Sequence, residues 1–276
     1  MRAGFTLIEL SIVLVIIGLI VGGILVGRDM IEAAQIRATI AQYQQFVTAV
    51  NTFRLKYGGL PGDITSTQAA AFGFQPARMD FVNQPCGSGS AITHGDGFLE
   101  ACDRNFDAFS FSQIEYEYGL FWRDLSSVQL IGNQFTIAVD GYNGAGHQPN
   151  ELLPVAKLGD NNYWIAYGVQ VPGAAAYGGN GYPVGNYFQL TGVTGLSGDT
   201  AEMSNGLSPL HAFALDNKID DGAPFGGIVR VSPSAGNIIF PSYPNSSCAP
   251  SSTDKAYRLA QTPNMPTCTL SFRSGF

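Results

Sequence analysis

The sequence contains little charge. Only 13% of its 276 residues are charged, about half the share in an ordinary soluble protein. The 14 lysines and arginines are outnumbered by 21 aspartates and glutamates, and no basic patch occurs along the chain. Nucleic-acid binding is therefore not expected. The low charge instead fits a protein that buries much of its surface in an assembly.

Sequence signatures of catalysis are also missing. The three histidines, His94, His147 and His211, are far apart in the chain. The G-x-S-x-G pattern of hydrolases, the H-E-x-x-H pattern of zinc proteases and the Walker A phosphate-binding pattern do not occur. We therefore expect neither an enzyme nor a protein that carries a cofactor.

Cysteine is scarce, and all four cysteines follow the first 85 residues. Four cysteines allow three pairings, of which the one with the shortest loops joins Cys86 to Cys102 and Cys248 to Cys268. Loops of this size contribute roughly 3 kcal/mol in the chain-entropy account. Disulfides require an oxidising compartment, which places this part of the chain outside the cytoplasm. Four free thiols are the alternative, and the absence of C-x-x-C disfavours zinc.

The one long hydrophobic run spans Phe5–Val26, close to Met1. A bilayer core is about 30 Å thick and takes roughly 20 apolar residues of helix to cross, so the run is long enough. The preceding Arg2 favours a cytoplasmic N-terminus, with the rest of the chain on the other side of the membrane.

Two ordinary interpretations of this run are incomplete. A cleaved secretory signal has an apolar centre of about 7–15 residues and a small-x-small cleavage site, and no clean site lies between Gly22 and Ala41. A plain signal anchor explains everything except Glu9, because a carboxylate inside a membrane helix costs roughly 2.5–3.5 kcal/mol at its centre and by default indicates a function.

The heptapeptide Gly4–Leu10, GFTLIEL, resembles the processing and assembly motif of type IV pilins and pseudopilins. The resemblance implies a prepilin peptidase that cuts after Gly4 and N-methylates the new terminus at Phe5. It also implies a filament in which Glu9 pairs with the terminal amine of Phe5 on a neighbouring subunit.

The chemistry of these residues agrees with that resemblance. Gly4 has no side chain, so its backbone can enter a protease cleft closely. Cutting there leaves an α-amine at the start of an apolar helix. Unlike charges attract strongly at low dielectric, and each is costly alone. Glu9 would therefore set the register between subunits, because a subunit docked out of step leaves a buried charge unpaired.

The helix is expected to continue beyond the apolar run and to end at Tyr57. The segment Gly58–Asp63, GGLPGD, supplies a glycine cap and a proline that cannot continue a helix; it resembles the segment that follows this helix in many prepilins. At 1.5 Å per residue the helix would span roughly 80 Å. Gln42, Gln44 and Gln45 are expected between the positions of an apolar stripe that packs on a globular head, formed by Ile36, Ile40, Tyr43, Val47, Val50 and Tyr57.

The remaining sequence predicts an α+β head. Helices are expected at about 113–127, with an aromatic cluster in the core, and at 209–219, with Ser208 as N-cap and Pro209 in the first turn. The period then changes to two, which predicts short strands at Phe135–Val139, Tyr163–Val171, Tyr187–Leu190, Gly227–Val231, Asn237–Phe240 and Thr267–Phe272. The fold class is therefore α+β: a long N-terminal helix packed on an antiparallel sheet, as the pilin resemblance also implies.

Residues 216–222, DNKIDDG, form the best metal candidate in the sequence. The oxygen ligands of Asp216, Asp220 and Asp221 suit calcium, which some pseudopilins bind in their heads. However, Lys218 and Ile219 occupy ligand positions of the EF-hand pattern. The favoured interpretation is a helix end that runs into an Asp-Gly turn, with no metal.

These observations predict three parts: a leader at residues 1–4, a helix at 5–57 and a globular head at 58–276. Within the helix, residues 5–26 would form the transmembrane segment or filament core, and residues 27–57 an amphipathic spine. The expected protein is a structural subunit of a type IV pilus-like filament for adhesion, motility, DNA uptake or protein secretion. Its partners would be other pilins, a prepilin peptidase and an inner-membrane assembly platform, and its head would be periplasmic or extracellular. The alternative is a signal-anchored periplasmic binding protein or adhesin that does not polymerise.

Overall fold

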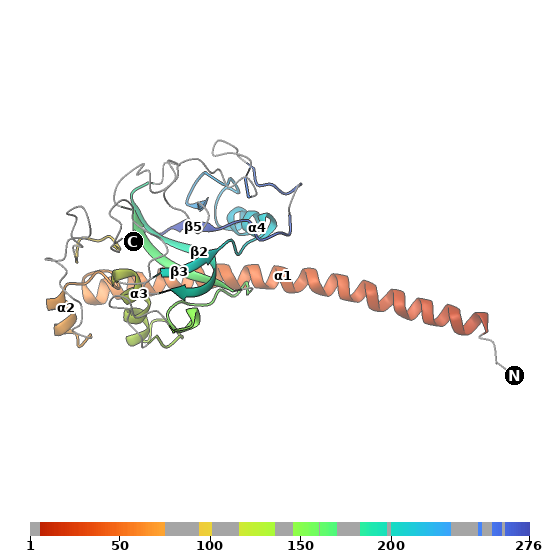
Figure 1. Cartoon of the computed structure of the whole chain (residues 1–276), viewed down its shortest axis with the longest axis horizontal. Coiled ribbons are helices and arrows are strands. Elements are labelled where there is room, and N and C mark those ends of the chain that lie inside the picture. The colour runs from red at the N-terminus through yellow and green to blue at the C-terminus, as the bar shows by residue number, and fades with distance from the viewer. Residues whose placement is uncertain are drawn as a thin grey trace.

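A computed structural model shows one long helix with a globular head around its C-terminal half (Figure 1). It describes residues 6–74, 94–100, 116–135, 146–159, 161–169, 183–197, 200–232, 248–249, 256–260 and 263–276. The other half of the helix extends away from the head toward the N-terminus. This arrangement confirms the predicted fold class of a long apolar helix with an antiparallel sheet.

Helix α1 runs from Leu7 to Tyr57 without a break. No proline occurs before Pro61, so nothing in the sequence interrupts the backbone hydrogen bonds of the helix. It ends at Gly58, which adopts the left-handed conformation at φ 79° and donates its N–H to the Arg54 carbonyl. This glycine cap is the one that the sequence predicted.

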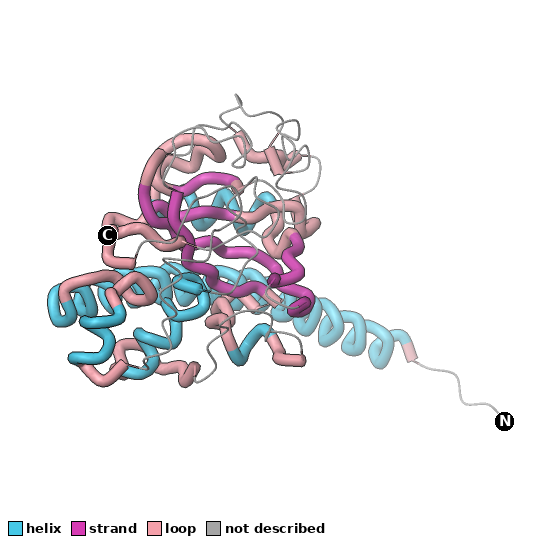
Figure 2. Tube along the Cα trace, turned by 60° about the vertical axis from the view of Figure 1, so that its left-hand side comes forward, coloured by secondary structure: helices cyan, strands magenta, loops and turns pink. Residues whose placement is uncertain are grey.

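Within the described residues the sheet has five antiparallel strands, arranged around the long strand β2 (Gly185–Ser197). Strand β1 (Asn162–Val169) pairs with one side of β2, and β5 (Leu270–Arg273) pairs with the other and carries β4 (Val229–Val231) at its far edge. Strand β3 (Thr200–Ser204) pairs with the C-terminal part of β2. These strands lie across α1 (Figure 2).

The shorter helices lie at different positions along α1. Helices α2 (Ser66–Ala71) and α3 (Tyr116–Ser127) lie near the C-terminal end of α1, and α4 (Pro209–Ile219) lies beside its middle (Figure 1). A 3-10 turn, Pro149–Glu151, precedes β1. Helix α4 has the predicted limits, because Ser208 caps it by accepting the His211 N–H at 3.2 Å.

Several predicted limits were wrong. Strand β2 is far longer than 187–190, and β3 and α2 were not predicted. Strand β1 agrees with its prediction up to Val169, and residues 170–171 of the predicted strand lie outside the described part of the chain. The sequence TAEMS of β3 alternates polar and apolar residues, with Ala201 buried and Met203 packed against the core, but it holds only two apolar side chains, too short a run to predict a strand. Residues 113–115, 136–139 and 237–240, which belong to a predicted helix and two predicted strands, lie outside the described part of the chain.

Aromatic side chains join α1, α3 and the sheet into one core. The ring of Phe46 on α1 lies 4.8 Å from that of Trp122 on α3, and Tyr43 lies 5.1 Å from Phe272 on β5, measured between centroids. Phe188 on β2 lies 5.7 Å from Trp122. Large buried rings contribute strongly to stability, so the C-terminal half of α1 is an integral part of the head.

Candidate functional site

The N-terminal half of α1 is an apolar rod that touches no other part of the described structure. Every side chain from Thr6 to Val26 is exposed, including Leu7 at 89%. Within the described residues, α1 is the one helix long and apolar enough to cross a membrane. An apolar surface of this size needs a lipid or protein partner. Gly4 and Phe5, where cleavage and methylation are predicted, lie outside the described residues.

Glu9 closes a capping box at the start of this helix. Its carboxylate accepts hydrogen bonds from the backbone N–H and the hydroxyl of Thr6, both at 2.8 Å. The Thr6 hydroxyl in turn accepts the Glu9 N–H at 3.3 Å. Such a reciprocal pair satisfies backbone donors that a helix N-terminus leaves open. Glu9 therefore has a local function in addition to the intersubunit contact predicted for it.

Gln42 on α1 connects this helix to the head. The sequence pattern had placed it between the positions of the apolar stripe, among the polar residues. Its side chain is buried on α1. Its amide oxygen accepts the indole N–H of Trp164 at 3.0 Å and the Lys157 backbone N–H at 3.1 Å, while its amide nitrogen donates to the Val155 carbonyl at 2.9 Å. The sequence around Gln42 does not reveal such partners, because they lie more than 110 residues away in the chain.

A second polar contact between spine and head lies nearer the exposed rod. The imidazole Nε2 of His211 on α4 lies 2.9 Å from the carboxylate of Glu32 on α1, and both side chains are partly exposed. Exposed pairs of this kind contribute about 0–1 kcal/mol, so this contact helps to orient α4 on the helix rather than to hold it there.

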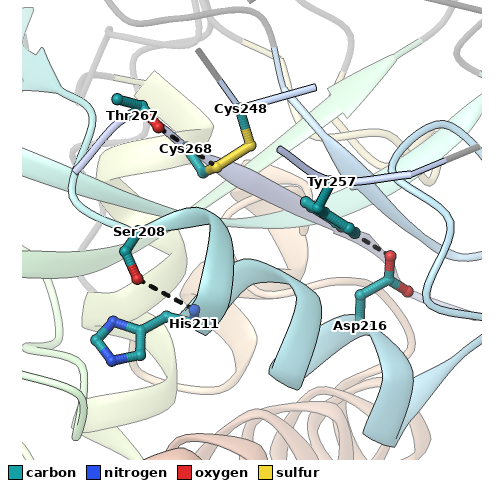
Figure 3. Close-up of a disulfide and its surroundings, with 7 residues drawn as sticks. All are labelled: Ser208, His211, Asp216, Cys248, Tyr257, Thr267 and Cys268. Carbon is teal, nitrogen blue, oxygen red and sulfur yellow. Dashed lines mark hydrogen bonds between the residues drawn. A yellow bond between two sulfur atoms is a disulfide. The ribbon is translucent and has the colours of Figure 1, made fainter. Parts of the chain in front are cut away.

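The Cys248–Cys268 disulfide is present, as predicted (Figure 3). The two Cα atoms are 5.1 Å apart and both residues are fully buried. It joins the segment before Tyr257 to the chain that leads into β5, and Leu207 pairs with Cys268 as an isolated β-bridge. The predicted partner cysteines Cys86 and Cys102 lie outside the described residues.

The carboxylates of Asp216, Asp220 and Asp221 come together at the end of α4, with ligand atoms within 4.8 Å of one another. All three accept hydrogen bonds from the protein. Asp216 accepts from the Gly222 N–H and the Tyr257 hydroxyl, Asp220 from the N–H groups of residues 228 and 229, and Asp221 from that of residue 223. These contacts close the loop that follows α4.

Burial raises the pKa of Asp216 to about 7, so the stability of the head should depend on pH. The unfolded carboxyl has a pKa near 3.9. Below about pH 4 the group is protonated in both states; as the pH rises to about 7, ionisation is disfavoured only in the folded state, and stability falls. We expect Asp216→Asn to show a smaller loss of unfolding free energy between pH 5 and pH 7.5 in urea titrations with EDTA present. Equal losses in the two proteins would contradict this assignment.

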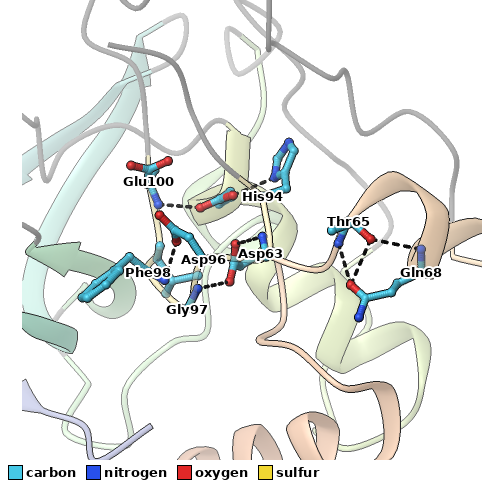
Figure 4. A network of polar contacts seen from close by, with 12 residues as sticks. Asp63, Thr65, Gln68, His94, Asp96, Gly97, Phe98 and Glu100 are labelled. Atoms are coloured by element: carbon cyan, nitrogen blue, oxygen red, sulfur yellow. Dashed lines mark hydrogen bonds and ion pairs between the residues drawn. The ribbon is translucent and has the colours of Figure 1, made fainter.

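A buried polar network lies where the chain leaves α1 (Figure 4). Asp63 is 1% exposed and accepts the backbone N–H groups of Gly95 and Gly97. Glu117 on α3 is fully buried; one of its oxygens lies 2.6 Å from His94 Nδ1 and the other accepts the Glu100 N–H at 2.7 Å. Desolvation raises the pKa of Asp63 to about 7 and that of Glu117 well above its usual range.

The sequence did not predict this network, because the three histidines are far apart in the chain. The signal available was weak: a GDG turn after His94 and a glutamate near the start of a predicted helix. Glu117 is a buried acceptor that connects α3 to residues 94–100.

One comparison with known proteins gives a match. Residues 1–25 match the family described as the prokaryotic N-terminal methylation motif. This match covers the segment with Gly4, Phe5 and Glu9 and none of the head. No curated protein and no solved structure matches the chain significantly.

Proposed function

We propose that this chain, which carries the N-terminal methylation motif typical of type IV pilins and pseudopilins, is a structural subunit of a pilus-like filament. A prepilin peptidase cuts it after Gly4, removes residues 1–4 and methylates Phe5. The mature subunit consists of the helix at 5–57, with residues 5–26 in the membrane or filament core, and the head at 58–276. The motif itself is an established feature of the chain; processing, division into parts and polymerisation are the proposal.

The observation that supports this proposal is the placement of the motif on α1. The motif begins a continuous helix whose first half is an exposed apolar rod and whose second half buries one face in the head core. A helix of this kind can leave a bilayer and enter a bundle of equivalent helices without any change in the head, because both environments offer apolar contacts.

The proposed location follows from the same features. The apolar helix and the motif fit a membrane-anchored protein, and Arg2 favours a cytoplasmic N-terminus. The Cys248–Cys268 disulfide requires an oxidising compartment, so we place the head in the periplasm before assembly and in the filament after it. The subunit's partners are other pilins, the peptidase and an inner-membrane assembly platform.

The size of the head favours a particular class of subunit. Residues 58–276 are more than many major pilins carry beyond their N-terminal helix, so we favour a minor pilin, a tip subunit or a large pseudopilin. The filament would serve adhesion, motility, DNA uptake or protein secretion. We assign no enzymatic activity to it.

Mass spectrometry of the N-terminus tests the processing step. We expect the chain purified from cells with an active prepilin peptidase to begin at N-methylated Phe5, and the chain from cells without the peptidase to begin at Met1. Gly4→Leu should stay uncut, because a large side chain prevents close approach of the backbone to a protease. Gly18→Ala is the matched control, since a methyl group at Gly18 meets no atom within 4 Å; it should be processed normally.

An intact Met1 in cells with an active peptidase would contradict the proposal. The chain would then be a signal-anchored periplasmic binding protein or adhesin that keeps its N-terminal residues and does not polymerise.

A further inference from the structure

Three potential metal ligands converge from separate parts of the chain at the buried network of Figure 4. Asp63 follows the end of α1, His94 precedes the GDG turn, and Glu117 lies in the first turn of α3. One ligand atom from each of the three lies within 4.8 Å of the other two. The set combines an imidazole with two carboxylates, which distinguishes it from an ordinary group of acidic side chains.

The site is removed from solvent. The side chains of Glu117 and His94 are 0% and 7% exposed, and Asp63 is 1% exposed. Asp63, Asp96 and Glu100 each disfavour ionisation of Glu117 by their charge. Collecting carboxylates in a buried place is costly unless positive charge accompanies them.

We propose that Asp63, His94 and Glu117 bind a divalent transition-metal ion of the zinc class. Zinc prefers histidine nitrogen and carboxylate oxygen at three or four positions, whereas calcium prefers six to eight oxygens and no imidazole. The ion takes the place of the proton shared between His94 Nδ1 and the Glu117 carboxylate. A water molecule completes a tetrahedral set.

The distances require small movements only. In a tetrahedral zinc site the ligand atoms lie 2.0–2.2 Å from the ion and therefore about 3.3 Å from one another. The 2.6 Å separation between His94 and Glu117 must open by about 0.7 Å, and the longer separations must contract. Asp63 remains available although it accepts two backbone N–H groups, because each carboxylate oxygen has a second lone pair.

The backbone around the site is already held in position. Gly62 approaches α3 so closely that a Cβ there would lie 2.4 Å from the Glu117 carbonyl oxygen. The Gly62 N–H also donates to the Asp124 carboxylate at 2.7 Å. A bound ion would thus join the segment after the C-terminal end of α1 to α3 and to the 94–100 segment.

Metal titration of the full-length chain in detergent tests the site. After treatment with EDTA, the protein is dialysed against Zn²⁺ and the bound metal is measured. We expect about one zinc ion per chain. At a zinc concentration about a hundred times Kd, the Tm should rise by roughly 5–10 °C; Ca²⁺ at the same concentration should not reproduce this shift.

Matched variants localise the ion. His94→Ala should weaken zinc binding by at least about tenfold and therefore cut the Tm shift by at least about half. His147→Ala is the control, because His147 also pairs with a glutamate, Glu151, at 2.9 Å, but on the exposed surface; it should bind zinc as the wild type does. Asp63→Asn keeps the shape of the side chain and should also lose zinc, which provides a second test if His94→Ala does not fold.

Three results would overturn the proposal. The first is wild-type protein that binds no zinc above the level of His94→Ala or, where that variant does not fold, of Asp63→Asn. The second is a loss of zinc in His147→Ala equal to the loss in the site variants. The third is zinc binding that survives in Asp63→Asn but is lost in Asp220→Asn, since this would place the ion at the carboxylate cluster after α4.

Discussion

Glu9→Ala is expected to abolish filament assembly and leave processing at Gly4 intact. The proposed contact joins the Glu9 carboxylate to the Phe5 amine of a neighbouring subunit in an apolar bundle. Removing one partner of a buried ion pair costs about 3–5 kcal/mol, because the remaining charge stays unpaired. The affinity of subunit addition should therefore fall by about 10²–10⁴-fold, while the cleaved sequence is unchanged.

Sheared filament fractions and N-terminal mass spectrometry measure the two outcomes separately. Ser11→Ala is the matched control, because Ser11 is another polar residue in the same apolar run but its hydroxyl bonds to the Ile8 carbonyl of its own helix at 2.8 Å. It should assemble at the wild-type level. Normal filaments from Glu9→Ala, or an equal loss in both variants, would show that no intersubunit pair depends on this carboxylate.

Gln42→Leu is expected to lower the free energy of unfolding of the head by about 2–5 kcal/mol. Leucine removes the acceptor for the Trp164 indole N–H and the Lys157 N–H, and the donor for the Val155 carbonyl. Each buried polar group left without a partner costs about 1–3 kcal/mol. Val155 and Lys157 are both exposed residues, so water can partly replace the lost bonds there, and the fully buried Trp164 N–H carries the largest share of the effect.

Urea unfolding of the full-length protein, followed by tryptophan fluorescence, measures this loss. The chain has two tryptophans, and Trp122 and Trp164 are both fully buried, so their emission reports the head core. Gln45→Leu is the control: it makes the same chemical change three residues further along α1 on its exposed face and should change stability by no more than about 0.5 kcal/mol. Equal effects of the two substitutions would show that Gln42 does not hold the spine to the head.

Local signals in the sequence were sufficient to predict where two of the helices begin or end. The cap at Gly58 and the Ser208-Pro209 start of α4 depend on residues adjacent to the helix end, and both predictions agree with the structure. The α1 stripe was correct for Ile36, Tyr43 and Val50 but omitted the neighbouring Phe46 and Phe53, which are also buried.

Features that depend on distant partners could not be predicted. Strand β3 pairs with the edge that β2 provides, and the alternation in its own sequence covers only Ala201 and Met203, too few residues to predict a strand. Gln42 is buried at the point where its amide oxygen accepts the indole N–H of Trp164. Asp63, His94 and Glu117 are 31 and 23 residues apart in the sequence, and no spacing rule connects them; only the packing of α3 on the end of α1 brings them together.

The Thr6–Glu9 capping box affects the state of the Glu9 carboxylate in a subunit that has not assembled. The Glu9 carboxylate accepts two hydrogen bonds from Thr6 of the same chain. A single subunit in the bilayer therefore does not hold a carboxylate without hydrogen-bond partners. In the proposed filament this internal contact would be exchanged for one with an adjacent molecule. Glu9 would then contribute to assembly the difference between the two contacts, so the energy of the intersubunit pair is an upper limit for that contribution.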